Sequence, residues 1–504
     1  MVTTDDLFER LPSIIGSRKK DIESIFNLFH THLRVEDEHY RAKSDLQQLK
    51  LFEIGSGSGA ATRFFKAQYF NVTACDSELF ATALAQYHAL TIEDFENDLH
   101  VLEAHQFTPE SFLVWCNQYI ATEEPTEDNL FFEHYSLNQQ KQGRNYFTSE
   151  NARRIDRARA LLQEPIFELL PAWFHWLRAE VLYRIFNCVN SSGSMKSCHQ
   201  QLGGETKTRY HQITKPFELE APVVFPGKKI DVLHGNVLDI IHKVEPHDVM
   251  FVDLPSTVHQ YSSNYHLLNT FCITDLWAPG EPAIDKGGIR KGYSSPFCKK
   301  TGLYQAFQQL ILQATDKTKY LVIPYPVDGL LNRHELGACL YQSGKNKVHL
   351  IPGEFENLYI VTLGNWQTPE QFQEQISKQF IRLPQYLHWA KHSAIVTKYD
   401  SQFGYHHFYY DNHFFATTDK NHQVLELVQD IYLSIPQKEK LILSVQELFN
   451  IYLGEKKWVK CLKCLRVLKQ ELPRKVYDEY HQMMLYVTKS LGVMKYHYKA
   501  KEIV

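Results

Sequence analysis

A possible reaction centre stands where an apolar run ends in the middle of the chain. Residues 249–252 predict a buried strand, and Asp253, Leu254, Pro255 and Ser256 follow it directly. The Asp253 carboxylate and the main-chain carbonyl of Leu254 can accept two hydrogen bonds from one amino group. Such a pair would aim the lone pair of a nucleobase amine at an electrophilic methyl group, once the base had left its stack. The alternative interpretation is an ordinary turn from strand to loop.

A glycine-rich turn near the N-terminus predicts a site for a nucleotide-like ligand. The mainly apolar residues 51–54 enter a turn that holds Gly55, Gly57 and Gly59, and a helix-like stretch follows. Glycines let the backbone approach a ligand closely, and the start of a helix favours negative charge. The turn by itself is weak evidence for a ligand.

Two carboxylates strengthen this prediction. A second short strand ends in Asp76, about 20 residues after the turn, where a carboxylate can bind a ribose diol. Asp76 can also cap the helix that begins nearby, and the two roles are compatible. Glu53 lies beside the glycines and could bind the cationic amino-acid end of S-adenosylmethionine, which a dinucleotide site would not require.

These features belong to a longer pattern of motifs. In chain order, the matching segments are 12–20, 52–59, 146–156, 231–237, 253–256, 260–268 and 320–331. In these segments the chain resembles the Dam-like adenine-N6 DNA methyltransferases (the DPPY type), with the cofactor motifs before the catalytic one. The stretch Gln-Tyr-Ser-Ser-Asn-Tyr-His-Leu-Leu at 260–268 is the most specific match, and the resemblance covers residues 10–355.

The resemblance implies a fold, a cofactor and a set of site residues. It implies a Rossmann-like, doubly wound α/β sheet that binds S-adenosylmethionine and double-stranded DNA. The implied catalytic loop is Asp253, Leu254, Pro255 and Ser256. The implied cofactor residues are Ile15, Gly16, Lys19, Glu53, Gly55, Gly57, Gly59, Asp76 and Asn236. The implied substrate or DNA contacts near the catalytic loop are Tyr261, Asn264 and Tyr265.

The departures from the family pattern cluster at the reacting base. The usual loop is Asp/Asn-Pro-Pro-Tyr/Phe, so Leu254 replaces a proline and Ser256 replaces the aromatic residue. Gly55 likewise stands where the family has phenylalanine. Stacking of a base on an aromatic ring is worth about 1–3 kcal/mol, so its loss alone would slow the reaction roughly 5- to 150-fold. Tyr261 or His259 could supply a substitute ring.

Basic residues predict where the phosphate backbone would bind. Arg290, Lys291, Lys299 and Lys300 follow the catalytic segment in a glycine-containing loop, and we interpret them as DNA contacts. A second cluster lies on a predicted helix, and its interpretation stays open between DNA contact and a solvated helix face. Its members are Arg144, Arg153, Arg154, Arg157 and Arg159.

Composition limits the classes of protein that remain. The 504 residues, 44% of them hydrophobic, predict more than one domain, and the net charge of −4 does not by itself indicate nucleic-acid binding. No apolar run is long enough for a membrane span, and the N-terminus lacks a signal-like apolar core. Nine unpatterned cysteines predict a reducing, cytoplasmic location. Cys461 and Cys464 lie in a helical pattern, so we predict packed side chains there and no metal site.

The chain divides into four predicted regions. Residues 1–84 and 230–365 form the methyltransferase-like sheet, and 85–229 form a mainly helical insertion that could recognise the target. Residues 366–420 form a small aromatic-rich extension, predicted as a sheet. Residues 421–504 form a helical C-terminal region. Its two predicted amphipathic helices, one carrying Leu441, Val445, Leu448 and Tyr452 and one carrying Trp458, Leu462, Leu465 and Leu468, could dock a partner, a second copy of the chain or the chain's own catalytic domain.

Three functional hypotheses follow. The first is an active, site-specific DNA adenine-N6 methyltransferase. The second, which we favour, is a methyltransferase-like protein that binds DNA and S-adenosylmethionine. In it methyl transfer is impaired or lost, and the chain serves as a subunit of a restriction-modification or antiviral defence system. The third is a methyltransferase that acts on RNA or on another amine.

Overall fold

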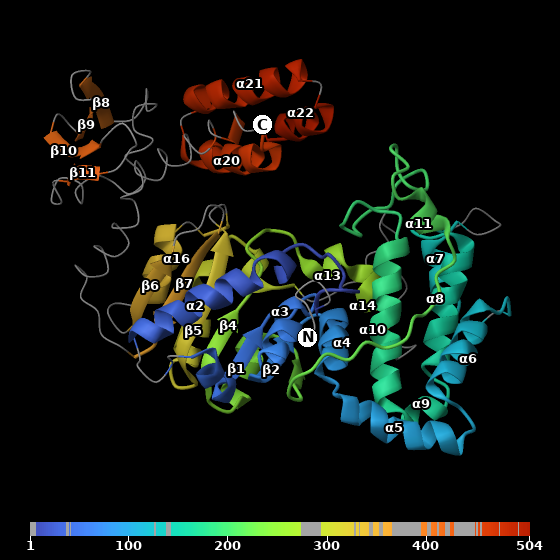
Figure 1. Ribbon diagram of the computed structural model, residues 1–504. Coiled ribbons are helices and arrows are strands. Elements are labelled where there is room, and N and C mark those ends of the chain that lie inside the picture. The colour runs from blue at the N-terminus through green and yellow to red at the C-terminus, as the bar shows by residue number, and fades with distance from the viewer. Residues whose placement is uncertain are drawn as a thin grey trace. The chain divides into compact units, whose positions relative to one another are not determined.

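The structure is a computed structural model of the chain (Figure 1). It describes residues 7–36, 40, 42–124, 126, 128–137, 143–273, 294–326, 329–331, 333–341, 346–351 and 356–364. In the C-terminal part it describes 395–400, 405–410, 413–418, 424–427, 449, 452–453, 456–472, 474–491 and 493–503.

A seven-stranded sheet carries the site. Its strand order is β3-β2-β1-β4-β5-β7-β6. The strands are β1 (Lys50–Ile54), β2 (Asn71–Asp76), β3 (Asp231–His234), β4 (His247–Val252), β5 (Thr318–Pro326), β6 (Lys347–Ile351) and β7 (Glu356–Thr362). β1 lies parallel to both β2 and β4, whereas β6 and β7 are antiparallel. The chain order reverses at β1 and β4, which is where ligands bind in doubly wound sheets. The predicted α/β sheet is confirmed.

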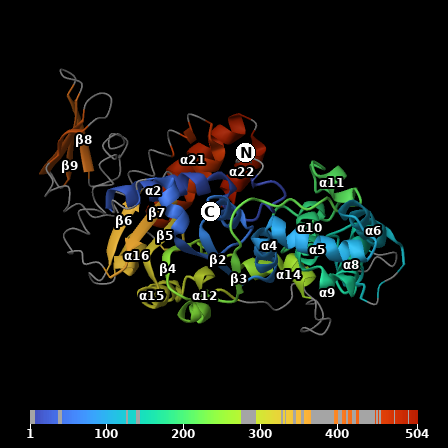
Figure 2. The same ribbon diagram turned by 60° about the horizontal axis from the view of Figure 1, so that its bottom comes forward.

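The central strands are apolar because helices cover both faces of the sheet. In β1 every residue after the first is buried, and in β4 the last four residues are buried. This is expected of parallel strands with two covered faces. Phe29 of α2 (Ile22–Glu36) packs on Tyr320, and Phe65 of α3 (Ala60–Ala67) packs on Phe251. Figure 2 shows α2 and α15 (Leu303–Ala314) on opposite sides of the sheet. The remaining elements beside the sheet are η1 (Arg18–Lys20), η2 (Lys43–Gln48), α4 (Leu79–Ala89), α12 (Val237–Ile240), η3 (Ile241–Lys243), α13 (Tyr261–Asn264), α14 (His266–Cys272), η4 (Pro296–Cys298) and α16 (Arg333–Tyr341).

The segment between β2 and β3 contains the predicted helical insertion. Its helices are α5 (Ile92–Ala104), α6 (Pro109–Ala121), α7 (Leu130–Tyr135), α8 (Ser149–Leu161), α9 (Ile166–Leu169), α10 (Pro171–Cys188) and α11 (Tyr210–Thr214). Trp173, Leu177 and Val181 face a common core because their spacing places them on one side of α10. Asp98 accepts hydrogen bonds from the amides of Ala172 and Trp173, which begin α10. This core also holds residues of α4 and α14, so the insertion packs on the methyltransferase-like part.

The chain forms two compact units, residues 1–324 and 325–504. Within the second, a four-stranded antiparallel sheet has the order β11-β10-β9-β8. Its strands are β8 (Ile395–Asp400), β9 (Tyr405–Tyr410), β10 (His413–Thr418) and β11 (Val424–Leu427). The aromatic-rich stretch thus forms a strand, as predicted. β11 lies beyond residue 420, inside the region predicted to be helical, so that prediction was wrong for residues 424–427.

Three helices end the chain: α20 (Trp458–Glu471), α21 (Arg474–Ser490) and α22 (Met494–Lys501). Leu462, Leu465 and Leu468 of α20 are buried, as their spacing predicts, and so are Cys461 and Cys464. Leu441, Val445 and Leu448 of the other predicted helix lie outside the described residues. Within the described part of the chain, no helix is long and apolar enough to cross a membrane.

Candidate functional site

The glycine turn after β1 is held by the neighbouring strand. The amide of Gly55 donates to the carbonyl of Cys75 over 2.8 Å, and the amide of Gly57 donates to the Asp76 carboxylate over 2.9 Å. Gly59 has φ +80° and precedes α3, and a β-carbon there would lie 2.2 Å from the ring of His88. Glycine is therefore required at this position. The turn brings backbone amides and the start of α3 to the carboxyl ends of β1 and β2.

Asp76 combines the two roles that the sequence left open. One carboxylate oxygen accepts from Gly57, and the other accepts from the amide of Glu78 at 2.9 Å, next to the start of α4. Burial raises the pKa of Asp76, and the amide hydrogen bonds offset part of that rise. The Asp76 side chain is only partly buried, so its lone pairs that remain free can still accept from a ligand.

Glu53 is a buried carboxyl beside this turn. Its side chain is fully buried, and neither oxygen accepts a hydrogen bond from the described residues, although the Thr62 hydroxyl lies near enough to lower its pKa in part. Burial raises the pKa of Glu53 to about 8, with a smaller contribution from the charges of Asp253 and Asp76. An unsatisfied buried carboxyl calls for a partner, because leaving it unpaired costs free energy. A cationic ligand group would supply one.

Asp253 directly adjoins the glycine turn. Its amide donates to the carbonyl of Ile54 over 2.9 Å, which continues the pairing of β4 with β1. Gly55 has φ +85°, and a β-carbon there would lie 2.2 Å from the carbonyl oxygen of Asp253. Glycine at position 55, where the resemblance would place phenylalanine, thus accompanies a close approach of the two loops. The sequence had not predicted this contact.

Arg18 forms a bidentate ion pair with the Asp253 carboxylate. Its Nε donates to one oxygen over 2.9 Å and its Nη2 donates to the other over 2.7 Å, while Nη1 binds Asp21. The two side chains are only 10% and 16% exposed. Burial raises the pKa of Asp253, and the Arg18 guanidinium offsets part of that rise. Lys19 was the residue predicted to act in this motif; Arg18, which precedes it in the Gly-Ser-Arg-Lys turn, was not predicted.

The residues Ile15, Gly16 and Lys19, predicted to bind cofactor, lie in the loop around η1. The Tyr265 hydroxyl accepts a hydrogen bond from the Ile15 amide over 2.7 Å. The Tyr261 hydroxyl donates to the Ile15 carbonyl over 2.6 Å and would meet a β-carbon on Gly16 at 3.0 Å. Lys19 donates to the Leu11 carbonyl, and burial lowers the pKa of its amine to about 8. The N-terminal loop is therefore fixed over the site by two tyrosines.

Two of the predicted substrate contacts are interior residues. Tyr265 is fully buried, and burial raises its pKa to about 12. Asn264 is buried and accepts from the Ser194 hydroxyl over 3.0 Å, and its carbonyl accepts from the Met195 amide. These side chains position the N-terminal loop and the insertion. In this structure neither is exposed to a duplex.

The other predicted residues lie in varied places. Leu254, Pro255 and Ser256 are half-buried in the loop after β4. Asn236 caps α12 by accepting from the Leu238 amide. Lys299 and Lys300 are exposed just after η4. Arg290 and Lys291 lie outside the described residues.

The arginine cluster of the insertion makes internal contacts. Arg154 binds Glu150 and the Phe217 carbonyl, and Arg159 binds Asp128. Arg157 donates to the carbonyl of Tyr119, and Arg153 lies 4.5 Å from the centre of the Phe132 ring. Arg144 donates to the His134 carbonyl. These contacts give the cluster a structural role, in addition to the two interpretations that the sequence left open.

The chain is similar in sequence to several known methyltransferases. It is 23% identical over 297 residues to the type II methyltransferase M.NlaIII of Neisseria lactamica, a match that covers 58% of this chain and 79% of that protein. It is 24% identical over 274 residues to the modification methylase LlaI of Lactococcus lactis (54% of this chain, 41% of that protein). It is 28% identical over 223 residues to the type II methyltransferase M.FokI of Planomicrobium okeanokoites (41% and 31%). The chain is thus similar to type II methyltransferases.

This relationship agrees with the geometry of the sheet and the two loops. No protein-family profile matches the chain, and no solved structure does. The matches span 79% of the Neisseria methyltransferase but less than half of the other two relatives.

Proposed function

We propose that the chain is a DNA adenine-N6 methyltransferase-like protein that binds S-adenosylmethionine and double-stranded DNA but transfers methyl groups poorly or not at all. It would act in the cytoplasm as a subunit of a restriction-modification or antiviral defence system. The relatives are named as a type II methyltransferase and a modification methylase, which supports the reaction class. The resemblance of the loop at 253–256 to the adenine-N6 pattern supports the target atom.

The residues around the glycine turn fit S-adenosylmethionine. Asp76 stands at the end of β2, where it can accept from a ribose diol. The Glu53 carboxyl has no hydrogen-bonded partner among the described residues and would gain one from the ligand's ammonium group. When bound, the cofactor supplies the methyl group. The protein's part is to hold the cofactor beside the loop that would receive the amine.

The proposed impairment rests mainly on the ion pair between Arg18 and Asp253. Both carboxylate oxygens already accept charge-assisted hydrogen bonds, which makes the group a weaker acceptor for a neutral amine. The adjacent Ser256 offers no ring on which a flipped base could stack. The Tyr261 hydroxyl donates a hydrogen bond to the Ile15 carbonyl, which holds in place the ring that could have replaced the missing aromatic residue. These three features would affect the binding of the reacting base and not the binding of the cofactor.

Methyl incorporation into unmethylated duplex DNA tests the proposal. Wild-type protein, Asp253→Ala and a restored-loop variant, Leu254→Pro with Ser256→Tyr, are compared with tritiated S-adenosylmethionine. We expect wild type to stay close to Asp253→Ala and the restored-loop variant to rise roughly 5- to 150-fold above wild type. Calorimetric titration should show that wild type binds the cofactor.

Three outcomes would contradict the proposal. Efficient incorporation by wild type that Asp253→Ala abolishes would identify an active DNA methyltransferase, a candidate favoured by the direct contact of the Asp253 loop with the glycine turn. Incorporation into RNA but not into DNA would identify the third hypothesis. Absence of cofactor binding would remove the common basis of all three.

A further inference from the structure

We infer that the three C-terminal helices form a binding surface for the phosphate backbone of duplex DNA. This inference rests on the proposed function in one respect, since that function makes duplex DNA the partner. It assigns the backbone contacts to a part of the chain far in sequence from the glycine turn and from the loop at 253–256. The surface is defined by the basic residues of 456–503.

Charge is strongly segregated along the chain. Residues 456–503 contain twelve Lys and Arg residues and only four Asp and Glu residues. The whole chain contains 54 basic and 58 acidic residues, so the remainder holds 42 basic and 54 acidic ones. The net charge of −4 for the chain is therefore the sum of +8 in residues 456–503 and −12 in the remainder. A concentrated basic unit is the electrostatic footprint of a polyanion partner.

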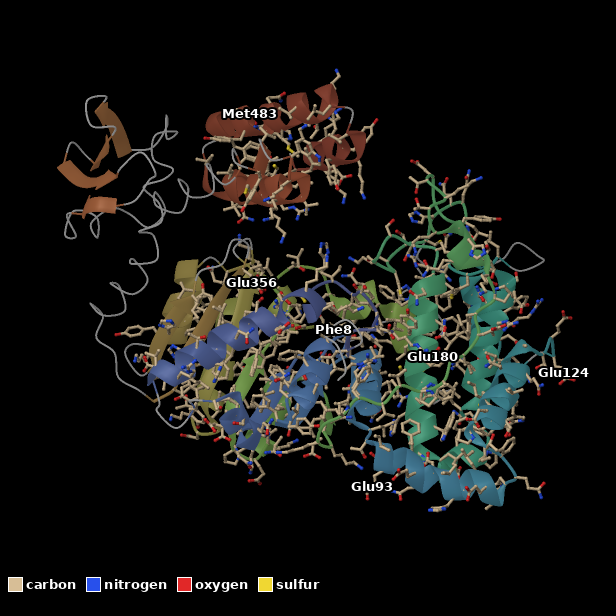
Figure 3. All side chains as sticks on the ribbon, in the orientation of Figure 1. Phe8, Glu93, Glu124, Glu180, Glu356 and Met483 are labelled. Carbon is tan, nitrogen blue, oxygen red and sulfur yellow. The ribbon has the colours of Figure 1, made fainter. Side chains whose placement is uncertain are left out.

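The cations lie on the outside of the three-helix unit. The helices bury apolar side chains against one another, including Leu465, Met484 and Ala500. Figure 3 shows nitrogen-tipped side chains projecting from all three helices. The exposed basic residues are Lys456, Lys457, Arg466, Lys469, Arg474, Lys489, Lys495, Lys499 and Lys501. Because the core is apolar and the cations are exposed, the fold of this unit does not require so much positive charge.

Aromatic rings bring part of this charge together. Trp458 at the start of α20 contacts Tyr496 of α22, with ring centres 6.5 Å apart. The Lys495 ammonium lies 5.9 Å from the centre of the Tyr496 ring, and Lys457 immediately precedes Trp458. Lys499 is four residues after Lys495, so the two lie on one side of α22. The start of α20 and the side of α22 thus present lysines from two helices around one aromatic contact.

The composition of this surface favours a duplex over a single strand. Single-stranded nucleic acids bind by stacking their bases on open aromatic platforms. Here Trp458 and Tyr496 contact each other and are half-buried, so exposed ammonium and guanidinium groups dominate the surface. Contacts of this kind neutralise phosphates without reading base sequence. The unit would therefore hold the duplex non-specifically while another part of the protein selects the site.

The salt dependence of binding tests the inference. Fluorescence anisotropy of the full chain with a labelled duplex of scrambled sequence is measured between about 50 and 200 mM salt. The test variant carries Lys457→Gln, Lys495→Gln and Lys499→Gln. A matched control makes the same change in charge at exposed residues far from the unit in the sequence: Arg34→Gln, Lys50→Gln and Lys243→Gln. Circular dichroism checks that all variants keep their helices.

We expect the test variant to bind more weakly and its log–log salt slope to fall by about 1 for each lysine that contacts a phosphate, up to about 3. The control should keep the wild-type slope. Equal slopes for the test variant and wild type, or an equal loss in the control, would overturn the inference while leaving the proposed function standing. Tighter binding of single-stranded RNA than of the duplex would also overturn it. Failure of wild type to bind any duplex would instead remove the proposed function itself.

Discussion

A β-carbon on Gly55 would lie 2.2 Å from the carbonyl oxygen of Asp253. The two residues directly follow the neighbouring strands β1 and β4, so the glycine turn and the loop at 253–256 meet through backbone alone. No side chain fits between them. This contact makes Gly55 a requirement of the site's geometry.

Replacing Gly55 with alanine should destabilise the protein and weaken cofactor binding. At φ +85° any side chain costs about 1–2 kcal/mol, and the overlap with Asp253 should add roughly 1–3 kcal/mol. Gly193→Ala is the matched control, because Gly193 has the same φ of +85° and nothing within 4 Å of a β-carbon. Urea unfolding should therefore separate the two variants by the overlap alone. Equal losses of stability would show that the two loops can move apart freely.

Arg18→Ala should lower stability by roughly 3–5 kcal/mol, because it leaves a largely buried carboxylate without its partner. The double variant Arg18→Ala with Asp253→Ala should recover part of that loss. The measurement is a double-mutant cycle by urea unfolding, and we expect a coupling free energy of about 1–3 kcal/mol. Simple additivity of the two single variants would show that the ion pair contributes nothing.

Stability should depend on the ionisation of Glu53. Its pKa in the folded protein is about 8 against an ordinary 4.5, so the folded state binds the proton more tightly than the unfolded state does. The contribution of the protonated Glu53 carboxyl to the free energy of unfolding is complete below pH 4.5 and is lost as the pH rises through about 8. The stability of wild type relative to Glu53→Gln should therefore fall by up to about 1.4 kcal/mol per pH unit across that window. A constant difference between the two proteins would contradict the raised pKa.

The same carboxyl should couple cofactor binding to proton release. A cationic group beside Glu53 favours its ionised form, so binding should expel a proton at pH values below about 8. Affinity for S-adenosylmethionine should then rise with pH and level off near that value. Calorimetry in buffers of different ionisation enthalpy measures the proton directly, and Glu53→Gln should release none.

Tyr265→Phe should loosen the N-terminal loop. Removing the hydroxyl leaves the Ile15 amide without its acceptor, at a cost of about 1–3 kcal/mol. Tyr261→Phe removes a donor to the Ile15 carbonyl, and we expect a smaller loss of about 0.5–1.5 kcal/mol. Hydrogen exchange at residues 14–18 should quicken in both variants. Unchanged exchange would place the anchor of this loop elsewhere.

Much of the architecture followed from local patterns. The apolar run before Asp253, the glycines after Ile54 and the strand before Asp76 predicted β4, the turn and β2, because buried parallel strands and tight turns have strong local preferences. Residues 85–229 were predicted as mainly helical, and the spacing of Trp173, Leu177 and Val181 within them is that of one side of a helix, here α10. β11 was missed because four residues, 424–427, give too short a pattern to separate from a helix.

The sequence by itself determined the order of strands and helices and the identity of the loops that could do chemistry, since those depend on neighbours along the chain. Only the tertiary structure decided that Arg18 takes both oxygens of Asp253 and that Tyr265 serves the Ile15 amide. These partners are 235 and 250 residues apart. No local propensity reports such distances, because the pairing arises when the sheet brings the end of β4 beneath the N-terminal loop.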